Sequence, residues 1–232
     1  MSQTLVLFDI DGTLLWSDGS GRAAMREALL RVYGSAGPID EYYFGGRTDR
    51  EAVRDLMEAA GFGSKDIWDR FGEMEAALAE ELRGRLATGE HQVRPCPGAL
   101  ELVALLEAHP RIVMGLLTGN MKATAWIKLW AAGFDPALFL LGAYGSESTH
   151  RTELGKLAVA RAQAITGEPF AGDRVVVIGD TPADIACAQV VGGRSLVVLT
   201  GWHDADELSA AGADVILEDL SDVDGVLKLI LE

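Results

Sequence analysis

The stretch "LVLFDIDGTLL", Leu5 to Leu15, joins an apolar run to two acids and a glycine. The run indicates a buried strand that ends at Asp9, and Gly12 allows the sharp turn that follows. Taken alone, the acids fit a hairpin or a solvated turn equally well. A helix-loop-helix calcium site is excluded, because counting from Asp9 places Leu14 where that loop needs glycine. The rest of the chain must decide why two carboxylates follow the strand.

Further short apolar runs, bounded by glycine or charged residues, follow along the chain. They predict strands buried on both faces at residues 4–8, 111–117, 138–141, 174–178, 195–199 and 214–217. Amphipathic stretches between the later runs predict helices at residues 121–132, 152–166, 182–191, 204–211 and 221–231. This alternation predicts an α/β fold, in which a parallel sheet carries helices on both faces.

About a hundred residues separate the first two predicted strands, although a single crossover helix would suffice. Apolar residues at helical spacing predict helices over 21–33, 49–60 and 64–86, the last continuous or broken near Gly72. Thr48 and Glu51 match a capping box at the start of the second helix. After Pro95 and Pro97, residues 99–108 supply the crossover helix. The spacing therefore predicts a core of residues 1–15 and 95–232 and an inserted all-helical domain of residues 16–94.

Polar side chains follow three of the predicted strands. Asp9 comes after the first, Thr118 with Gly119 and Asn120 after the second, and Asp180 after the run "VVVIG". The carboxyl ends of parallel strands lie at one edge of a sheet, where α/β proteins bind their ligands. If these polar residues were only solvated turns, that explanation would have to hold at three separate strand ends. A functional site at this edge of the sheet is therefore the better interpretation.

Length and charge limit the function classes. The chain of 232 residues suits one domain with an insertion, and its formal net charge of −15 argues against nucleic-acid and anionic-membrane partners. Its two cysteines, Cys96 and Cys187, form no metal motif and fit a reducing compartment. No secretory signal precedes Asp9, and no apolar stretch reaches the ~20 residues of a membrane span. We expect a cytoplasmic protein, whose substrate, if anionic, requires a metal ion and a few cations.

Three motifs in order give the chain a family resemblance. DxDGT stands as Asp9 to Thr13, a hydroxyl closes an apolar strand at Thr118, and GDxxxD stands as Gly179 to Asp184. The chain resembles the haloacid dehalogenase-like superfamily over nearly its whole length, and residues 44–49 are similar to the cap loop of phosphoglycolate-phosphatase-like members. The resemblance implies a Rossmann-like core with a helical cap. It also implies a magnesium-dependent phosphatase that hydrolyses small phosphorylated metabolites, phosphoglycolate among the candidates, through an aspartyl-phosphate.

The resemblance assigns roles at the first and fourth motifs. Asp9 is the expected nucleophile, and Asp11 the acid that protonates the leaving oxygen and then accepts a proton from water. A free aspartic acid has a pKa of about 3.9, so this role predicts a raised pKa for Asp11. The implied Mg²⁺ ligands are the Asp9 carboxylate, the Asp11 carbonyl oxygen and the Asp180 carboxylate, while Asp184 holds coordinated water. The alternative is that Asp180 and Asp184 only cap a helix.

The second and third motifs leave two choices open. The Thr118 hydroxyl and the backbone N–H groups of Gly119 and Asn120 can bind phosphoryl oxygens, although Asn120 could instead cap the next helix. The family usually has a lysine at the third motif, but Arg151 stands at the matching position, and Lys156 comes five residues later. We favour Arg151, because its guanidinium can bridge the nucleophile and the phosphate.

The inserted segment offers one further candidate. Arg47 lies in the loop that resembles the cap loop, and it either contacts the distal part of the substrate or is a surface arginine. A β-phosphoglucomutase-like phosphosugar mutase shares the nucleophile, acid and metal site, so it is the alternative enzyme. A catalytically silent binding protein is the alternative outside enzymes. For the oligomeric state we expect a monomer or a homodimer.

Overall fold

A six-stranded parallel sheet forms the centre of the molecule, seen in a computed structural model that describes residues 3–232. Its strands are β1 (Thr4–Phe8), β4 (Ile112–Thr118), β5 (Leu141–Tyr144), β6 (Val175–Gly179), β7 (Arg194–Val198) and β8 (Val215–Leu217). They lie in the order β5-β4-β1-β6-β7-β8. Leu7 of β1 pairs with Gly115 on one side and Val177 on the other. The stretch that opened the sequence analysis is therefore a central strand, with β4 and β6 as neighbours.

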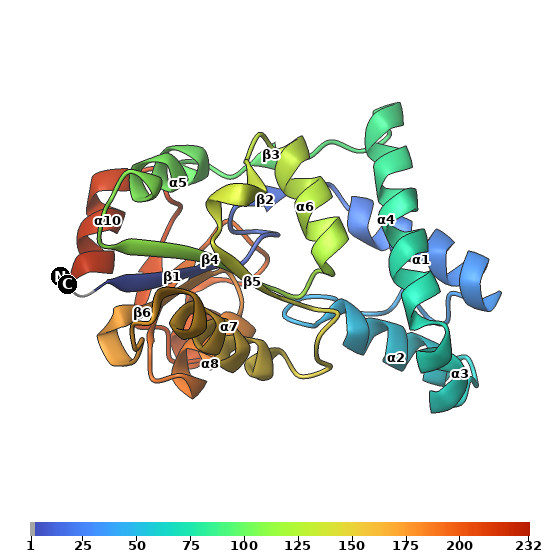
Figure 1. Cartoon of the computed structure of the whole chain (residues 1–232). Coiled ribbons are helices and arrows are strands. Elements are labelled where there is room, and N and C mark those ends of the chain that lie inside the picture. The colour runs from blue at the N-terminus through green and yellow to red at the C-terminus, as the bar shows by residue number, and fades with distance from the viewer. Residues whose placement is uncertain (1–2) are drawn as a thin grey trace.

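Helices cover both faces of this sheet, because successive residues of β1 point to opposite sides. Leu5 and Leu7 pack with residues of α7 (Arg151–Thr166) and α8 (Pro182–Val190), below the sheet in Figure 1. Val6 and Phe8 pack with residues of α5 (Ala99–Glu107) and α10 (Val223–Leu231), above it. The connections are completed by α6 (Lys122–Ala131), α9 (Ala205–Ala210) and the short turns η1 (Pro136–Leu138) and η2 (Gly172–Arg174). The predicted α/β fold is confirmed.

The inserted residues form four helices at the right of Figure 1, namely α1 (Ser20–Tyr33), α2 (Asp49–Ala59), α3 (Ser64–Asp69) and α4 (Phe71–Thr88). They enclose most of a second hydrophobic cluster, which includes Met25, Leu56 and Met74 and extends to Met121 beside α6. The chain leaves the sheet at β2 (Leu15–Trp16) and returns at β3 (Arg94–Pro95), and these two segments pair antiparallel. Both connections between the sheet and the inserted helices are thus held side by side.

One expected strand differs from the structure, and one open choice between helices is decided by it. The strand expected at 138–141 begins only at Leu141, because residues 136–138 form the turn η1, in which the Asp135 carboxylate accepts a hydrogen bond from the Ala137 N–H at 2.9 Å. Of the two possibilities for residues 64–86, the broken helix is confirmed, because α3 ends at Asp69 and α4 begins at Phe71, close to Gly72. Within residues 3–232, no helix is long and apolar enough to cross a membrane.

Candidate active site

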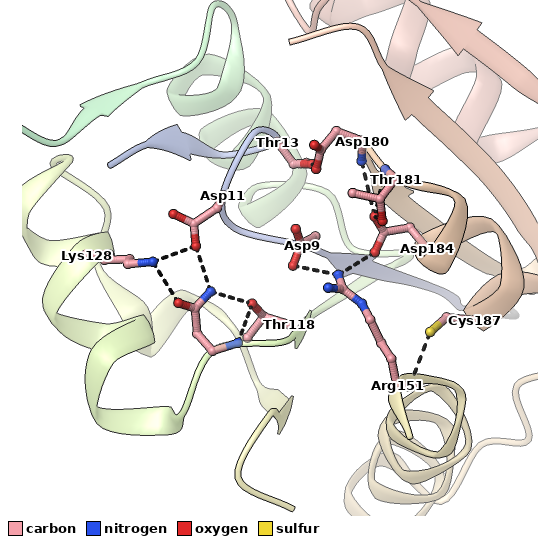
Figure 2. Close-up of polar contacts among 11 residues, drawn as sticks. Asp9, Asp11, Thr13, Thr118, Lys128, Arg151, Asp180, Thr181, Asp184 and Cys187 are labelled. Carbon is pink, nitrogen blue, oxygen red and sulfur yellow. Dashed lines mark hydrogen bonds and ion pairs between the residues drawn. The ribbon is translucent and has the colours of Figure 1, made fainter. Parts of the chain in front are cut away.

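Three neighbouring strands deliver polar side chains to one edge of the sheet (Figure 2). Asp9 follows β1, Thr118 ends β4, and Asp180 follows β6. All three are buried, with 4%, 0% and 3% of their surface exposed. The predicted convergence of these residues is what the parallel register produces, since β4, β1 and β6 are adjacent.

The turn after β1 fits closely against the fourth motif. Gly12 has a φ of 85°, in the left-handed region that favours glycine, and a Cβ there would collide with the Asp180 carboxylate. The Thr13 hydroxyl donates a hydrogen bond to Asp180 Oδ1 at 3.1 Å. The glycine and threonine of the first motif therefore hold Asp180 beside Asp9.

A group of three buried carboxylates could hold a metal ion. Asp9, Asp180 and Asp184 each offer an oxygen, and these oxygens lie within 4.8 Å of one another. Burial and the neighbouring charges of Asp184 and Asp11 raise the pKa of Asp9 to about 7, although Arg151 opposes the shift. Burial and the same crowding by acids raise the pKa of Asp180 well above its usual range. An all-oxygen donor set with excess negative charge suits a hard divalent cation.

Arg151, at the start of α7, joins two of these acids. Its Nη2 lies 2.9 Å from Asp9 Oδ1 and 2.6 Å from Asp184 Oδ1 (Figure 2). Although burial opposes a charged guanidinium, Asp184 and Asp9 raise the pKa of Arg151. Lys156, the alternative, is an exposed side chain further along the same helix. The structure thus brings Arg151, and not Lys156, to Asp9.

Asp184 has more contacts than the motif predicts. Besides binding Arg151, it accepts hydrogen bonds from the Thr181 N–H at 3.0 Å and the Thr181 hydroxyl at 2.7 Å, which complete a capping box at the start of α8. The Asp180 N–H donates to the same oxygen at 3.2 Å. Asp184 therefore caps a helix and anchors Arg151 at once, and its expected contact with coordinated water stays a prediction.

Asp11 lies on the other side of Asp9, where three polar groups contact its carboxylate. Oδ2 accepts hydrogen bonds from Lys128 Nζ at 2.7 Å and Asn120 Nδ2 at 2.8 Å, and Oδ1 accepts one from the Ser17 hydroxyl at 2.6 Å. Burial would raise the pKa of Asp11, but the Lys128 charge and these hydrogen bonds lower it overall. The sequence-based expectation of a raised pKa is wrong for this arrangement, because a lysine distant in sequence supplies the opposing charge.

The segment after β4 lies between Asp11 and the inserted helices. Asn120 Nδ2 also donates to the Thr118 hydroxyl at 2.9 Å, so its side chain binds site residues. Met121, and not Asn120, stands at the N-cap of α6, which makes the helix-cap alternative for Asn120 wrong. At Gly119 a Cβ would collide with the Arg47 carbonyl oxygen. Glycine at this position lets the loop from the inserted segment pack directly on the core.

Asp49 binds that loop to the core through both its backbone and its side chain. The Asp49 N–H donates to the Gly119 carbonyl at 2.7 Å, and the Asp49 carboxylate accepts from the Met121 N–H at 2.8 Å. The Arg47 side chain instead pairs with Glu51 at 2.7 Å and Asp55 at 3.5 Å. Since Glu51 binds Arg47, only half of the predicted capping box forms, with the Glu51 N–H donating to Thr48 at 3.1 Å.

A cavity of about 480 Å³ opens between this loop and the start of α7 and α8. Arg47, Arg151 and Thr181 are among its lining residues, together with Tyr43 and His203. The Tyr43 hydroxyl and His203 Nε2 lie 3.0 Å apart, which joins the inserted segment to the core at the rim. Arg47 thus borders a space beside the site, while its own charge is paired with acids of α2.

Sequence reasoning missed three residues of this site, Lys128, Ser17 and Asp49. Lys128 lies on the face of α6 that buries Ala125 and Leu129, so a lysine at an apolar position of the helical pattern was the available signal. Asp49 was taken only as the first residue of a helix, and no pattern along the chain indicates that it binds the Met121 N–H.

The fold and site together define an α/β protein with a buried acidic centre, an arginine and a hydroxyl at the carboxyl edge of its sheet. The chain belongs to the haloacid dehalogenase-like hydrolase family, whose model matches residues 6–189. The resemblance stated from the motifs is confirmed, and the chain is a hydrolase.

Curated relatives and solved structures agree with this assignment. The chain is 30% identical to a validoxylamine A 7'-phosphate phosphatase from Streptomyces hygroscopicus subsp. limoneus, over 94% of this chain and 95% of that protein. It is 26% identical to a phosphoglycolate phosphatase from Synechococcus elongatus, over 94% of each chain. A hydrolase from Pseudomonas syringae has the same fold, with a TM-score of 0.71 at 23% identity over 97% of this chain and 98% of that one.

Proposed function

We propose that this hydrolase is a magnesium-dependent phosphatase of small phosphate monoesters, which acts through an aspartyl-phosphate on Asp9. The main supporting observation is the position of Asp9, which lies between Arg151, at 2.9 Å, and Asp11. Asp9 also shares a candidate cation site with Asp180 and Asp184. Curated relatives named as phosphatases support the same reaction class.

In the first step, an oxygen of Asp9 attacks the phosphorus and the ester P–O bond breaks. The Thr118 hydroxyl, the N–H groups of Gly119 and Asn120, and the Arg151 guanidinium bind the phosphoryl oxygens. Asp11 gives its proton to the leaving alcohol oxygen. Lys128 lowers the pKa of Asp11, so the dianionic phosphate must raise that pKa for Asp11 to carry the proton.

In the second step, a water oxygen attacks the phosphorus and Asp11 accepts the proton that the water releases. The bond between Asp9 and phosphorus then breaks, which yields inorganic phosphate and the free Asp9 carboxylate. The lowered pKa of Asp11 favours the ionised state that this step requires.

The residues fit Mg²⁺ as the cofactor. The Asp9 and Asp180 carboxylates and the Asp11 carbonyl oxygen would be its protein ligands, with Asp184 holding coordinated water. Bound Mg²⁺ supplies positive charge that favours ionised Asp9 and balances the phosphate. In the described part of the chain, the carboxylates of Asp9, Asp11, Asp180 and Asp184 face only two buried cations, Arg151 and Lys128, so a dication is electrostatically favoured.

Residues 16–94 act as a cap over a core of residues 1–15 and 95–232. The pairing of β2 with β3 at the two connections supports this division, as does a hydrophobic cluster formed mostly by residues of the inserted segment. The cap excludes water and selects the leaving group. Arg47 contributes from the rim of the cavity. Because it is paired with Glu51 and Asp55, Arg47 attracts a carboxylate such as that of phosphoglycolate less strongly than an unpaired arginine would.

A cytoplasmic location is part of the proposal, supported by two buried free thiols, Cys96 and Cys187, that suit a reducing compartment. For the oligomeric state, the proposal is a monomer or a homodimer.

Phosphate release from phosphoglycolate, glycerol 3-phosphate and glucose 6-phosphate tests the function, with magnesium or with EDTA. We expect release that needs magnesium, disappears in Asp9→Asn, and persists in Asp206→Asn, the same change at an exposed acid. No release from any ester, or release that survives Asp9→Asn, would contradict the proposal. Interconversion of sugar phosphates without release would favour the phosphosugar mutase.

A further inference from the structure

A buried lysine, Lys128 on α6, lies in the site outside every motif of the family resemblance. Its side chain is 5% exposed, and Nζ lies 2.7 Å from Asp11 Oδ2 and 2.7 Å from Asn120 Oδ1 (Figure 2). Ala125 and Leu129, its neighbours on the same helix face, are apolar and fully buried, so packing alone would favour an apolar side chain here. Burial of an ammonium group is unfavourable unless partners compensate, and here the main partner is the proposed proton carrier.

The contacts around Lys128 form a closed triangle. Lys128 donates to Asp11 and to Asn120, and Asn120 Nδ2 donates to the same Asp11 oxygen at 2.8 Å. The Ser17 hydroxyl, at 2.6 Å, occupies the other oxygen. Asn120 Nδ2 also reaches the Thr118 hydroxyl at 2.9 Å. The carboxylate of Asp11 is thus held at both oxygens, in fixed relation to Thr118 at the end of β4.

Lys128 also lies where the inserted helices meet the core. A Cβ on Gly21, in the first turn of α1, would come within 3.3 Å of its Nζ. Glycine at this position leaves space for the ammonium group beneath α1, and the lysine is enclosed between α1 and the sheet.

We propose that Lys128 is a positioning residue, which holds Asp11 and Asn120 so that the Asp11 carboxyl group faces the leaving oxygen. The inference rests on the proposed phosphatase function and extends it. Lys128 acts through these two side chains and does not touch the reacting atoms. When the ester P–O bond breaks, the proton of the Asp11 carboxyl group moves to the alcohol oxygen, and the distance of that transfer depends on where Lys128 holds the carboxyl group.

The leaving group separates this role from a merely structural one. An alkyl alkoxide is a poor leaving group and needs the proton, whereas nitrophenolate leaves from p-nitrophenyl phosphate without one. The ratio kcat/KM reports the steps up to release of the alcohol, so it excludes the later attack of water. A misplaced Asp11 therefore lowers kcat/KM for the alkyl ester alone, while general damage to the site lowers it for both esters.

The test compares Lys128→Met with wild type on p-nitrophenyl phosphate and on glucose 6-phosphate or phosphoglycolate, whichever wild type hydrolyses faster. We expect kcat/KM for the alkyl ester to fall by about 30-fold and for the aryl ester to stay within about 3-fold, since general acid catalysis contributes 10²–10⁴-fold. Lys128→Gln, which keeps a hydrogen-bond donor, should recover part of the loss. Lys122→Met, on the exposed part of the same helix, should equal wild type on both esters.

Equal losses on both esters, or an unchanged or faster alkyl reaction, would overturn the positioning role. If Lys128→Met does not fold, as judged by thermal unfolding, the same comparison on Lys128→Gln decides. Failure of the phosphatase proposal is a separate result, because wild type would then release no phosphate from any ester in the presence of magnesium.

Discussion

Asp9→Asn is expected to remove activity and also to change the pH dependence of stability in the metal-free protein. Asp9 is buried, and burial with the nearby Asp184 and Asp11 raises its pKa from 3.8 to about 7 despite Arg151. The folded protein therefore binds the Asp9 proton more tightly than the unfolded chain does. The stability contributed by protonated Asp9 is complete below the unfolded pKa and is lost as the pH rises through the folded pKa, between about 4 and 7.

The size of the effect follows from the two pKa values. A difference of about three pH units corresponds to a loss of about 4 kcal/mol at pH 8, of which about 1.5 kcal/mol has already occurred at pH 5. Asparagine has no proton to lose. The free energy of unfolding of Asp9→Asn, relative to wild type, should therefore rise by about 2.5 kcal/mol between these two pH values.

Urea unfolding in EDTA at both pH values measures this difference, with Asp206→Asn as the matched control at an exposed acid. Added magnesium should stabilise wild type more than Asp9→Asn, because the cation favours the ionised carboxylate. The reasoning would be refuted if the difference in free energy of unfolding between Asp9→Asn and wild type did not change with pH. It would also be refuted if the variant became less stable relative to wild type toward pH 8.

Three further substitutions test the site and the core. Arg151→Met removes the cation between Asp9 and Asp184, and it should lower the free energy of unfolding by about 3–5 kcal/mol. Urea titrations measure this loss, and a loss below about 1 kcal/mol would contradict a buried ion pair. Gly119→Ala should force its Cβ against the Arg47 carbonyl and displace the cap loop. We therefore expect kcat/KM in the phosphate-release assay to fall about 10-fold or more. An unchanged kcat/KM would mean that the position of the loop is unimportant. Leu106→Ala, in the core beyond the site, should cost about 2–5 kcal/mol of stability with KM unchanged, and a changed KM would show that the core and site are coupled.

Much of the architecture could be predicted from local pattern. Strands such as residues 4–8 are short, apolar and bounded by turn residues, and their alternation with amphipathic helices favours only one fold class. The turn at 136–138 was missed, because a short apolar run beside a proline fits a strand or a tight turn equally well. The break between α3 and α4 falls at Arg70, close to the Gly72 that indicated it.

The sequence by itself determined the family, the α/β fold and the meeting of Asp9, Thr118 and Asp180. The pattern of strands and helices along the chain is local, and parallel strands place their carboxyl ends at one edge of the sheet. Only the tertiary structure decided which charge faces each acid. Lys128 is 117 positions from the Asp11 that it binds, and Arg151 is 33 positions from Asp184. Such contacts depend on how helices pack over the sheet, and electrostatic energies vary with distances of a few ångströms that no motif encodes.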